Sequence, residues 1–190
     1  MKKLILMALV LMLCASALAE ARWPFDLTDD TTLEEAIAVA VDVFGEGFYE
    51  DDNAYIINRT SVPMMDKTVS YVRVRAGTRP GSFIMQISCC EDRGVADHYI
   101  AGTAAYDVAL EYGIPDKSEF ESDAADPFGR NASSFENDID DLMAMMQKTP
   151  YVDCRYKGTW LMDNGGFIFE LHPMEHLIFY YYTWIWLPEL

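Results

Sequence analysis

Alternation of side-chain character over residues 71–76 constrains this chain more than any other feature. Apolar positions (Val72, Val74, Ala76) alternate with polar or basic ones (Tyr71, Arg73, Arg75). Successive side chains of a strand point to opposite faces of a sheet, so the pattern predicts a strand with one buried face and one basic face. The turn T-R-P-G at 78–81 is followed by a run with a matching inner face: Phe83, Met85, Ile87 and Cys89. An amphipathic antiparallel hairpin is therefore predicted.

Further runs rich in β-branched and aromatic residues predict more strands. In the first half of the chain we predict strands over residues 54–62, 67–76 and 82–90. In the second half we predict strands over residues 152–162, 167–171 and 177–186. The D-N-G-G at 163–166 is a strong hairpin turn signal, so the last three runs are expected to form a meander.

Three helices are predicted from capping and stop signals. Thr31-Thr32-Leu33-Glu34 matches a capping box and opens an apolar stripe that continues to Phe44, before Gly45 and Gly47. A second helix is expected over residues 103–112, because Gly113 and Pro115 follow it. Ser133-Ser134-Phe135-Glu136 repeats the capping pattern and predicts a third helix that ends near Lys148, before Pro150.

This order of elements predicts an α+β fold with helices packed on an antiparallel sheet. T-T-L-E-E-A-I at 31–37 aligns without a gap with S-S-F-E-N-D-I at 133–139, which favours a degenerate duplicated αβββ unit. We expect residues 20–190 to form a single domain. The duplication would divide it into two halves, at about 28–92 and 131–188, joined by a helix and an acidic loop at about 115–132.

Residues 1–19 have the three parts of a secretory signal peptide. Lys2 and Lys3 precede an uncharged apolar run from Leu4 to Leu13, and the stretch ends in Ala17-Leu18-Ala19. Cleavage is expected after Ala19. The apolar run is shorter than the roughly 20 residues that cross a bilayer, so no transmembrane segment is expected in the mature chain. The predicted location is secreted or periplasmic.

The charge of the chain excludes one class of partner. There are 14 Lys and Arg against 31 Asp and Glu, and removal of Lys2 and Lys3 changes the net charge from −17 to −19. Nucleic acid is not an expected partner, because phosphate binding needs a basic surface. Residues 59–79 run against this trend with five basic side chains and the single acid Asp66. This segment is expected to dock onto the protein's own acidic residues or to hold an anionic ligand.

One motif in the chain carries possible catalytic chemistry. His172, Glu175 and His176 have the spacing H-x-x-E-H, and H-P-M-E-H-L-I-F at 172–179 resembles the H-x-x-E-H-x-x-F motif of pitrilysin-like and insulin-degrading peptidases. The resemblance covers these eight residues. It implies a zinc-dependent hydrolase in which His172 and His176 bind the metal and Glu175 accepts a proton from bound water.

The surrounding residues favour a different interpretation of this motif. In that family an acidic third ligand follows dozens of residues later, whereas 14 residues remain after His176. Pro173 suits a turn, and the residues after His176 are mainly β-branched or aromatic, which favours a strand. We therefore expect the two histidines to flank a hairpin turn, and we assign no catalytic, metal-binding or cofactor-binding residue and no cofactor.

Three cysteines remain after the predicted cleavage: Cys89, Cys90 and Cys154. Alternation places Cys89 on the inner face of its strand and Cys90 on the outer face. Cys154 shares a parity with Tyr156 on an apolar strand face. Two expectations stay open, because export permits a Cys89–Cys154 disulfide and burial equally accounts for two free thiols.

The last predicted strand is aromatic on both of its faces. It contains Phe179, Tyr180, Tyr181, Tyr182, Trp184 and Trp186. A central strand covered on both faces would explain this composition. An exposed platform for a saccharide or a protein partner would also explain it. We therefore predict an exported, soluble, acidic binding module of the cell envelope without enzymatic activity, with a zinc hydrolase and a carbohydrate-binding module as alternatives.

Overall fold

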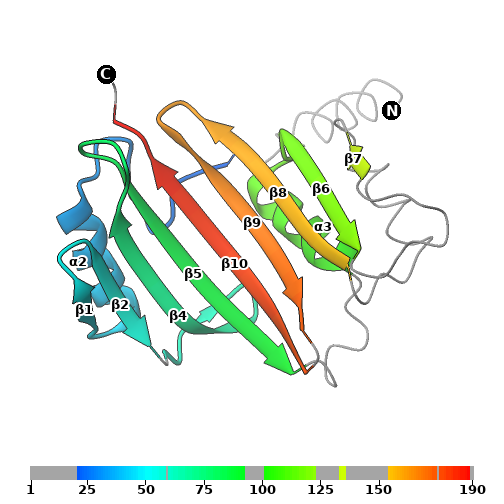
Figure 1. The fold of residues 1–190 in the computed structure, drawn as a ribbon, viewed down its shortest axis with the longest axis horizontal. Helices are drawn as coiled ribbons and strands as arrows, with labels where there is room; N and C mark the ends of the chain where they lie inside the picture. Colours follow the sequence, from blue (N-terminus) through cyan, green and yellow to red (C-terminus); the bar gives the residue numbers. More distant parts are fainter. Residues whose placement is uncertain are drawn as a thin grey trace, which may run out of the picture.

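The fold is built on one antiparallel sheet. The computed structural model describes residues 21–58, 60–92, 101–122, 133–135, 154–174 and 176–188. The strand order is β1-β2-β4-β5-β10-β9-β8-β6-β7, and the short β3 pairs with β4 (Figure 1). The strands are β1 (Phe48–Asp51), β2 (Ala54–Asn58), β3 (Pro63–Met64), β4 (Lys67–Ala76), β5 (Phe83–Asp92), β6 (Lys117–Ser122), β7 (Ser133–Phe135), β8 (Cys154–Met162), β9 (Gly165–Pro173) and β10 (Leu177–Trp186). The described residues also form helices α2 (Leu33–Phe44) and α3 (Ala101–Tyr112).

The predicted α+β class is wrong, because the described residues form a mainly-β fold. The stretch Ser133–Phe135, where a third helix was expected to begin, is strand β7, and residues 136–148 lie outside the described part of the chain. Strand β6 occupies part of the predicted acidic loop, and residues 123–132 of that loop also lie outside. The duplicated αβββ unit is wrong as well, since its second helix begins as a strand.

Strand pairing explains this difference from the prediction. Six consecutive residues of β6 pair with β8, from Lys117 opposite Thr159 to Ser122 opposite Cys154. This ladder provides hydrogen bonds that no local pattern reveals, and it outweighs weak intrinsic preferences. β7 then adds to the free edge of β6 through three further pairs.

Several predicted elements are confirmed. β4 and β10 have the predicted bounds, and α2 ends at Phe44 before Gly45, whose φ is +97°. The capping box of α2 lies one residue later than predicted, with Thr32 as the N-cap. The Glu35 backbone N–H donates to Thr32 Oγ1 (3.3 Å) and the Thr32 N–H donates to Glu35 Oε2 (2.9 Å). These hydrogen bonds hold the pKa of Glu35 below its ordinary value.

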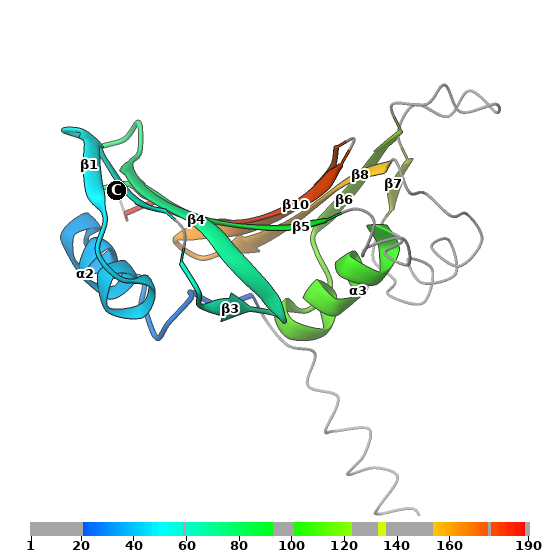
Figure 2. The same cartoon turned by 90° about the horizontal axis from the view of Figure 1, so that it is seen from below.

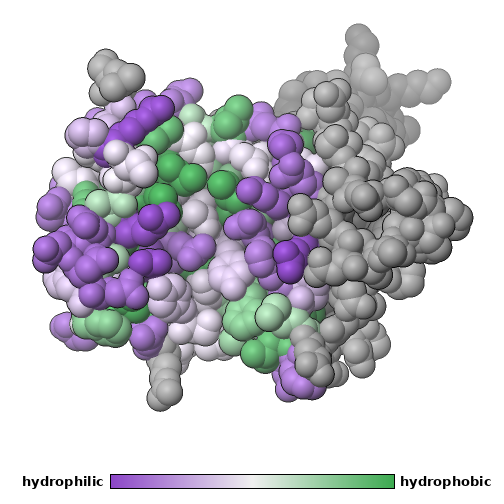
Figure 3. Space-filling model, viewed as in Figure 1, coloured by the Kyte–Doolittle hydropathy of each residue, from purple (hydrophilic) through white to green (hydrophobic). Residues whose placement is uncertain are grey.

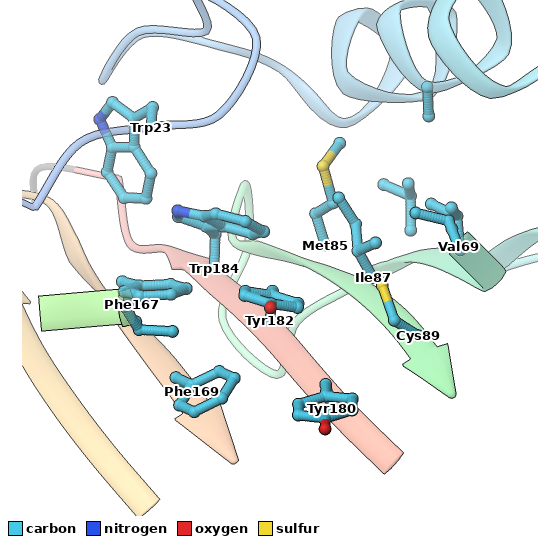
Figure 4. Packing of buried hydrophobic residues seen from close by; sticks show 14 of the residues in the cluster. Trp23, Val69, Met85, Ile87, Cys89, Phe167, Phe169, Tyr180, Tyr182 and Trp184 are labelled. Carbon is cyan, nitrogen blue, oxygen red and sulfur yellow. The ribbon is translucent and has the colours of Figure 1, made fainter. Parts of the chain in front are cut away.

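A single hydrophobic core lies between one face of the sheet and the elements packed on it. Figure 4 shows the inward side chains of β5, β10 and β9 standing on the same side of their strands. The inward face of β10 consists of Ile178, Tyr180, Tyr182, Trp184 and Trp186, each at most 2% exposed. α2 adds Ala36, Ala40 and Phe44 to this core, and α3 adds Ala104, Val108 and Tyr112.

The segment from Ala21 to Thr31, here called the N-terminal strap, crosses the end of this core. The ring of Trp23 stacks on Trp186 with a centroid distance of 4.1 Å. Two indole N–H groups of β10 bind carbonyl oxygens of the strap, Trp184 to Arg22 (3.0 Å) and Trp186 to Thr28 (3.1 Å). Buried indole N–H groups need acceptors, and the strap supplies one for each of these two tryptophans.

The two faces of the sheet differ in what covers them. In Figure 2, α2, α3 and β3 all lie on one side, and both ends of the sheet rise away from them. The opposite side is concave and is covered by no described element. We define the concave face as the outward-facing residues of β4, β5, β10, β9 and β8, and Figure 3 shows it from the front. No helix among the described residues is long and apolar enough to span a membrane.

Candidate functional site

The structure separates the two histidines of the H-x-x-E-H motif. His172 is the second-last residue of β9, and His176 is exposed just before β10. The Met174 N–H donates to the Leu177 carbonyl oxygen (2.7 Å) and closes the hairpin. The predicted hairpin is therefore confirmed, while Glu175 lies outside the described residues. His172 packs edge-on against Tyr181 (5.2 Å), and its Nε2 lies 3.9 Å from Glu170 Oε1.

The positions of the two histidines differ from those that the zinc motif requires. The motif needs both imidazoles on one turn of a helix, and here one is on a strand and the other is in a turn. Within the described ranges, no group of three or more His, Cys, Asp or Glu side chains is arranged to hold a metal ion.

We predict that the chain, purified without added metal, contains far less than one zinc per molecule. Zinc titration is expected to give the same weak response for the wild type and for His176→Ala, because the two imidazoles do not converge. Elemental analysis and calorimetry measure both quantities. One tightly held zinc per chain that is lost in His176→Ala would contradict this prediction.

Among the described residues, only one face of the aromatic strand β10 is covered by other elements. Tyr180, Tyr182, Trp184 and Trp186 lie in the core and cannot form an exposed platform for a saccharide. The other alternate set, which points to the concave face, is partly exposed: Phe179, Tyr181, Thr183 and Ile185. In the sequence, this surface is indicated only by the lack of charged residues in both alternate sets of β10 side chains.

Of the two expectations for Cys89, the structure shows the free thiol and not the disulfide with Cys154. Cys89 and Cys90 are both free thiols. β5 and β8 are separated by β10 and β9, so Cys89 lies three strand spacings, about 14 Å, from β8, whereas disulfide-bonded Cα atoms lie within about 7 Å. Burial raises the pKa of the Cys89 thiol to about 12, although nearby Lys67 opposes this shift. Cys89 is thus a protonated core residue.

An apolar stripe runs across the concave face. It follows β10 and includes one residue from each neighbouring strand: Ile84, Ile168, Phe179, Tyr181 and Ile185. Ile84 lies directly opposite Ile185, and Ile168 lies opposite Thr183. All five side chains are partly exposed. This apolar stripe joins segments from both halves of the chain.

The concave face also differs from the rest of the molecule in charge. The described residues include eight Lys and Arg and twenty Asp and Glu. The concave face has four of these eight (Arg73, Arg75, Arg155 and Lys157) but only two of the twenty (Asp92 and Glu170). The remainder is therefore strongly acidic, at four basic against eighteen acidic residues. Of the predicted basic segment, Arg73 and Arg75 face this surface, and Arg73 Nη2 pairs with Glu50 Oε2 (2.7 Å).

Two buried polar atoms of the concave face have no hydrogen-bond partner in the described structure. They are Arg73 Nε and Ser88 Oγ. Ser88 is 5% exposed and lies between Tyr71 and Tyr181 in the strand register. Burial raises the pKa of both tyrosines. Unpaired buried polar atoms are few in folded proteins.

A small hollow adjoins the stripe on the β8 side. It has a volume of about 250 Å³ and is lined by side chains of both charges, including Arg155, Lys157, Glu170 and His172. His172 thus belongs to this mixed-charge surface. The concave face combines an apolar centre with polar and charged flanks.

The fold and this surface define a class of protein: a mainly-β chain with one curved sheet, covered on one side and open on the other. Comparison with protein-family models, with curated proteins and with solved structures found no match.

Proposed function

We propose that this chain is a non-enzymatic binding module that recognises another protein through its concave face. The observation that carries the proposal is the partly exposed apolar stripe at the centre of a nearly neutral surface on an otherwise acidic molecule. Exposed contiguous apolar surface commonly marks interaction sites. The signal peptide expected over residues 1–19 would place the binding event in the cell envelope or outside the cell.

The side chains of the surface favour a protein over a saccharide. Three of the five stripe residues are isoleucines, which pack against apolar side chains, whereas sugars stack on exposed aromatic faces. Arg73 and Tyr181 are of the residue types enriched in protein interfaces.

Charge favours a different protein over a second copy of this chain. Two mature chains would each have a net charge of about −19, so their association is opposed at low ionic strength. A neutral or basic partner would instead be attracted by the acidic remainder of the molecule while it packs on the stripe. The expected partner therefore presents an apolar patch on a neutral or basic protein.

Site-specific photocrosslinking tests this proposal. A benzophenone side chain at Thr183, in the centre of the concave face, is expected to give one discrete protein adduct in cells of the source organism. The same probe at Asp42, an exposed position of α2, serves as the matched control and is expected to give none. Ile168→Asp is expected to reduce the Thr183 adduct by about tenfold, as a buried charge does in an interface centre.

The composition of the adduct distinguishes the alternatives. Peptides of a second protein, together with this chain beginning at Glu20, would support both the binding function and the expected cleavage. An adduct of two copies of this chain, an equal adduct from Asp42, or an adduct that Ile168→Asp leaves unchanged would contradict the proposal. Circular dichroism of Ile168→Asp checks that the substitution leaves the sheet folded.

A further inference from the structure

A second candidate site lies on the opposite side of the sheet from the concave face. A hollow of about 330 Å³ separates the turn between β3 and β4 from α3, and Tyr182 of β10 lines it. Met65 and Asp66 form that two-residue turn, and both have positive φ angles of +46° and +64°. This geometry is that of the tight turns that join hairpin strands, so it fixes the backbone at Asp66 beside the hollow.

The lining of the hollow combines three carboxylates and the Lys67 side chain with an apolar wall. Asp66 comes from the turn, and Asp107 and Glu111 are one helical turn apart on α3. Burial raises the pKa of Asp107, Lys67 lowers it, and Asp66 raises it. Met65, Ala104 and Val108 supply the apolar part.

The two cations near the carboxylates already have acidic partners. Lys67 Nζ lies 3.6 Å from Glu91 Oε1 and 4.6 Å from the ring centroid of Tyr180. Arg22 pairs with Glu111 at the rim. With Glu91 included, four carboxylates stand against two cations, so the local charge is negative.

Tyr182 provides a second and independent indication of a ligand. Its side chain is 1% exposed and lines the hollow, yet among the described residues its hydroxyl has no hydrogen-bond partner. Burial raises its pKa, so the phenol is neutral and its oxygen can accept a hydrogen bond. Figure 4 shows Tyr182 beside Tyr180 on the inward side of β10.

We propose that this hollow binds a primary aliphatic ammonium group. Asp66 and Asp107 accept two of its N–H bonds and the Tyr182 oxygen accepts the third, while the attached methylene chain contacts Met65 and Val108. A phosphate or carboxylate is excluded by the three carboxylates of the lining. A metal ion is disfavoured because the described residues hold no arrangement of ligands suited to one.

Calorimetric titration at low ionic strength tests this site with two sources of the same group. Butylamine, with a single ammonium group, represents a free amine, and Nα-acetyl-lysine amide, whose side-chain ammonium is free, represents a lysine side chain of a protein. Each of the variants Asp107→Asn and Tyr182→Phe is expected to raise the dissociation constant of the bound probe about tenfold. This is the effect of losing one charge-assisted hydrogen bond. Tyr182→Phe removes no hydrogen bond within the described residues, so it is expected to fold normally.

Two controls separate this site from general attraction to an acidic protein. Asp42→Asn makes the same charge change on exposed α2 and is expected to leave binding unchanged. Tetramethylammonium has the same charge but no N–H, and it is expected to bind at least about tenfold more weakly. Binding by either probe with this pattern supports the site, and the stronger probe identifies the source. No binding by either probe, or equal weakening by Asp42→Asn, would overturn the proposal of an ammonium site. Neither result would bear on the proposed binding function of the concave face.

Discussion

Replacement of Trp186 by alanine is expected to lower the free energy of unfolding by about 3–5 kcal/mol, the range measured for large aromatic residues in cores. The Trp186 ring lies between Trp23 (4.1 Å) and Phe83 (4.4 Å) and is nearly parallel to both. Its indole N–H donates to the Thr28 carbonyl oxygen. The substitution would therefore leave a cavity and would also remove the contact that holds the N-terminal strap.

Urea unfolding followed by circular dichroism measures this effect without depending on tryptophan emission. Trp186→Phe keeps part of the stacked ring but loses the N–H, so it is expected to lose about 1–3 kcal/mol. Leu161→Ala, at a residue that is 72% exposed, is a surface control with an expected change within about 0.5 kcal/mol. Trypsin is expected to cleave after Arg22 faster in Trp186→Ala. A loss below about 1 kcal/mol would show that the strap contributes little to the stability of the core.

Gly165→Ala is expected to destabilise the chain by roughly 2–6 kcal/mol through strain and overpacking together. Gly165 has a φ of +149°, and a Cβ built there would lie 1.8 Å from the Ile185 carbonyl oxygen. That oxygen belongs to the backbone of β10, so no rotamer change can relieve the clash. The sheet would have to separate locally where β8, β9 and β10 meet.

Gly45→Ala is the matched control for this substitution. Its φ is +97° and its ψ is −175°, but a Cβ at that position meets no atom within 4 Å. It therefore carries the strain of the backbone without the clash, and we expect a loss of about 1–3 kcal/mol. Chemical unfolding measures the loss of stability in both variants, and the difference between the two losses is the contribution of the steric clash. Equal losses in the two variants would show that β9 and β10 adjust freely around Gly165.

The elements that sequence reasoning predicted well are those specified by local patterns. β4 alternates between apolar and polar residues over most of its length, and α2 begins with a capping box and ends at a glycine. β6 and β7 contain mostly polar residues and have no such pattern. β6 is a strand because β8, more than thirty residues away in the chain, offers a free edge, and β7 then pairs with β6.

The candidate site was less predictable than the fold. The histidine motif has the spacing of a catalytic motif, yet the hairpin places one imidazole on the concave face and the other in a turn. The apolar stripe has no motif. It exists because β5 pairs with β10, which brings Ile84 opposite Ile185 across about half of the chain.

The sequence by itself determined the positions of the amphipathic strands and of α2, the strong negative charge and the predicted export signal, since each depends on neighbouring residues. Only the tertiary structure decided which face of β10 is buried. Both of its alternate sets are aromatic or aliphatic, so local pattern could not choose between them. The buried face is the one that the N-terminal strap and the helices cover. The strap, more than 150 residues away in the chain, accepts the indole hydrogen bonds of Trp184 and Trp186, and the helices pack on the same face.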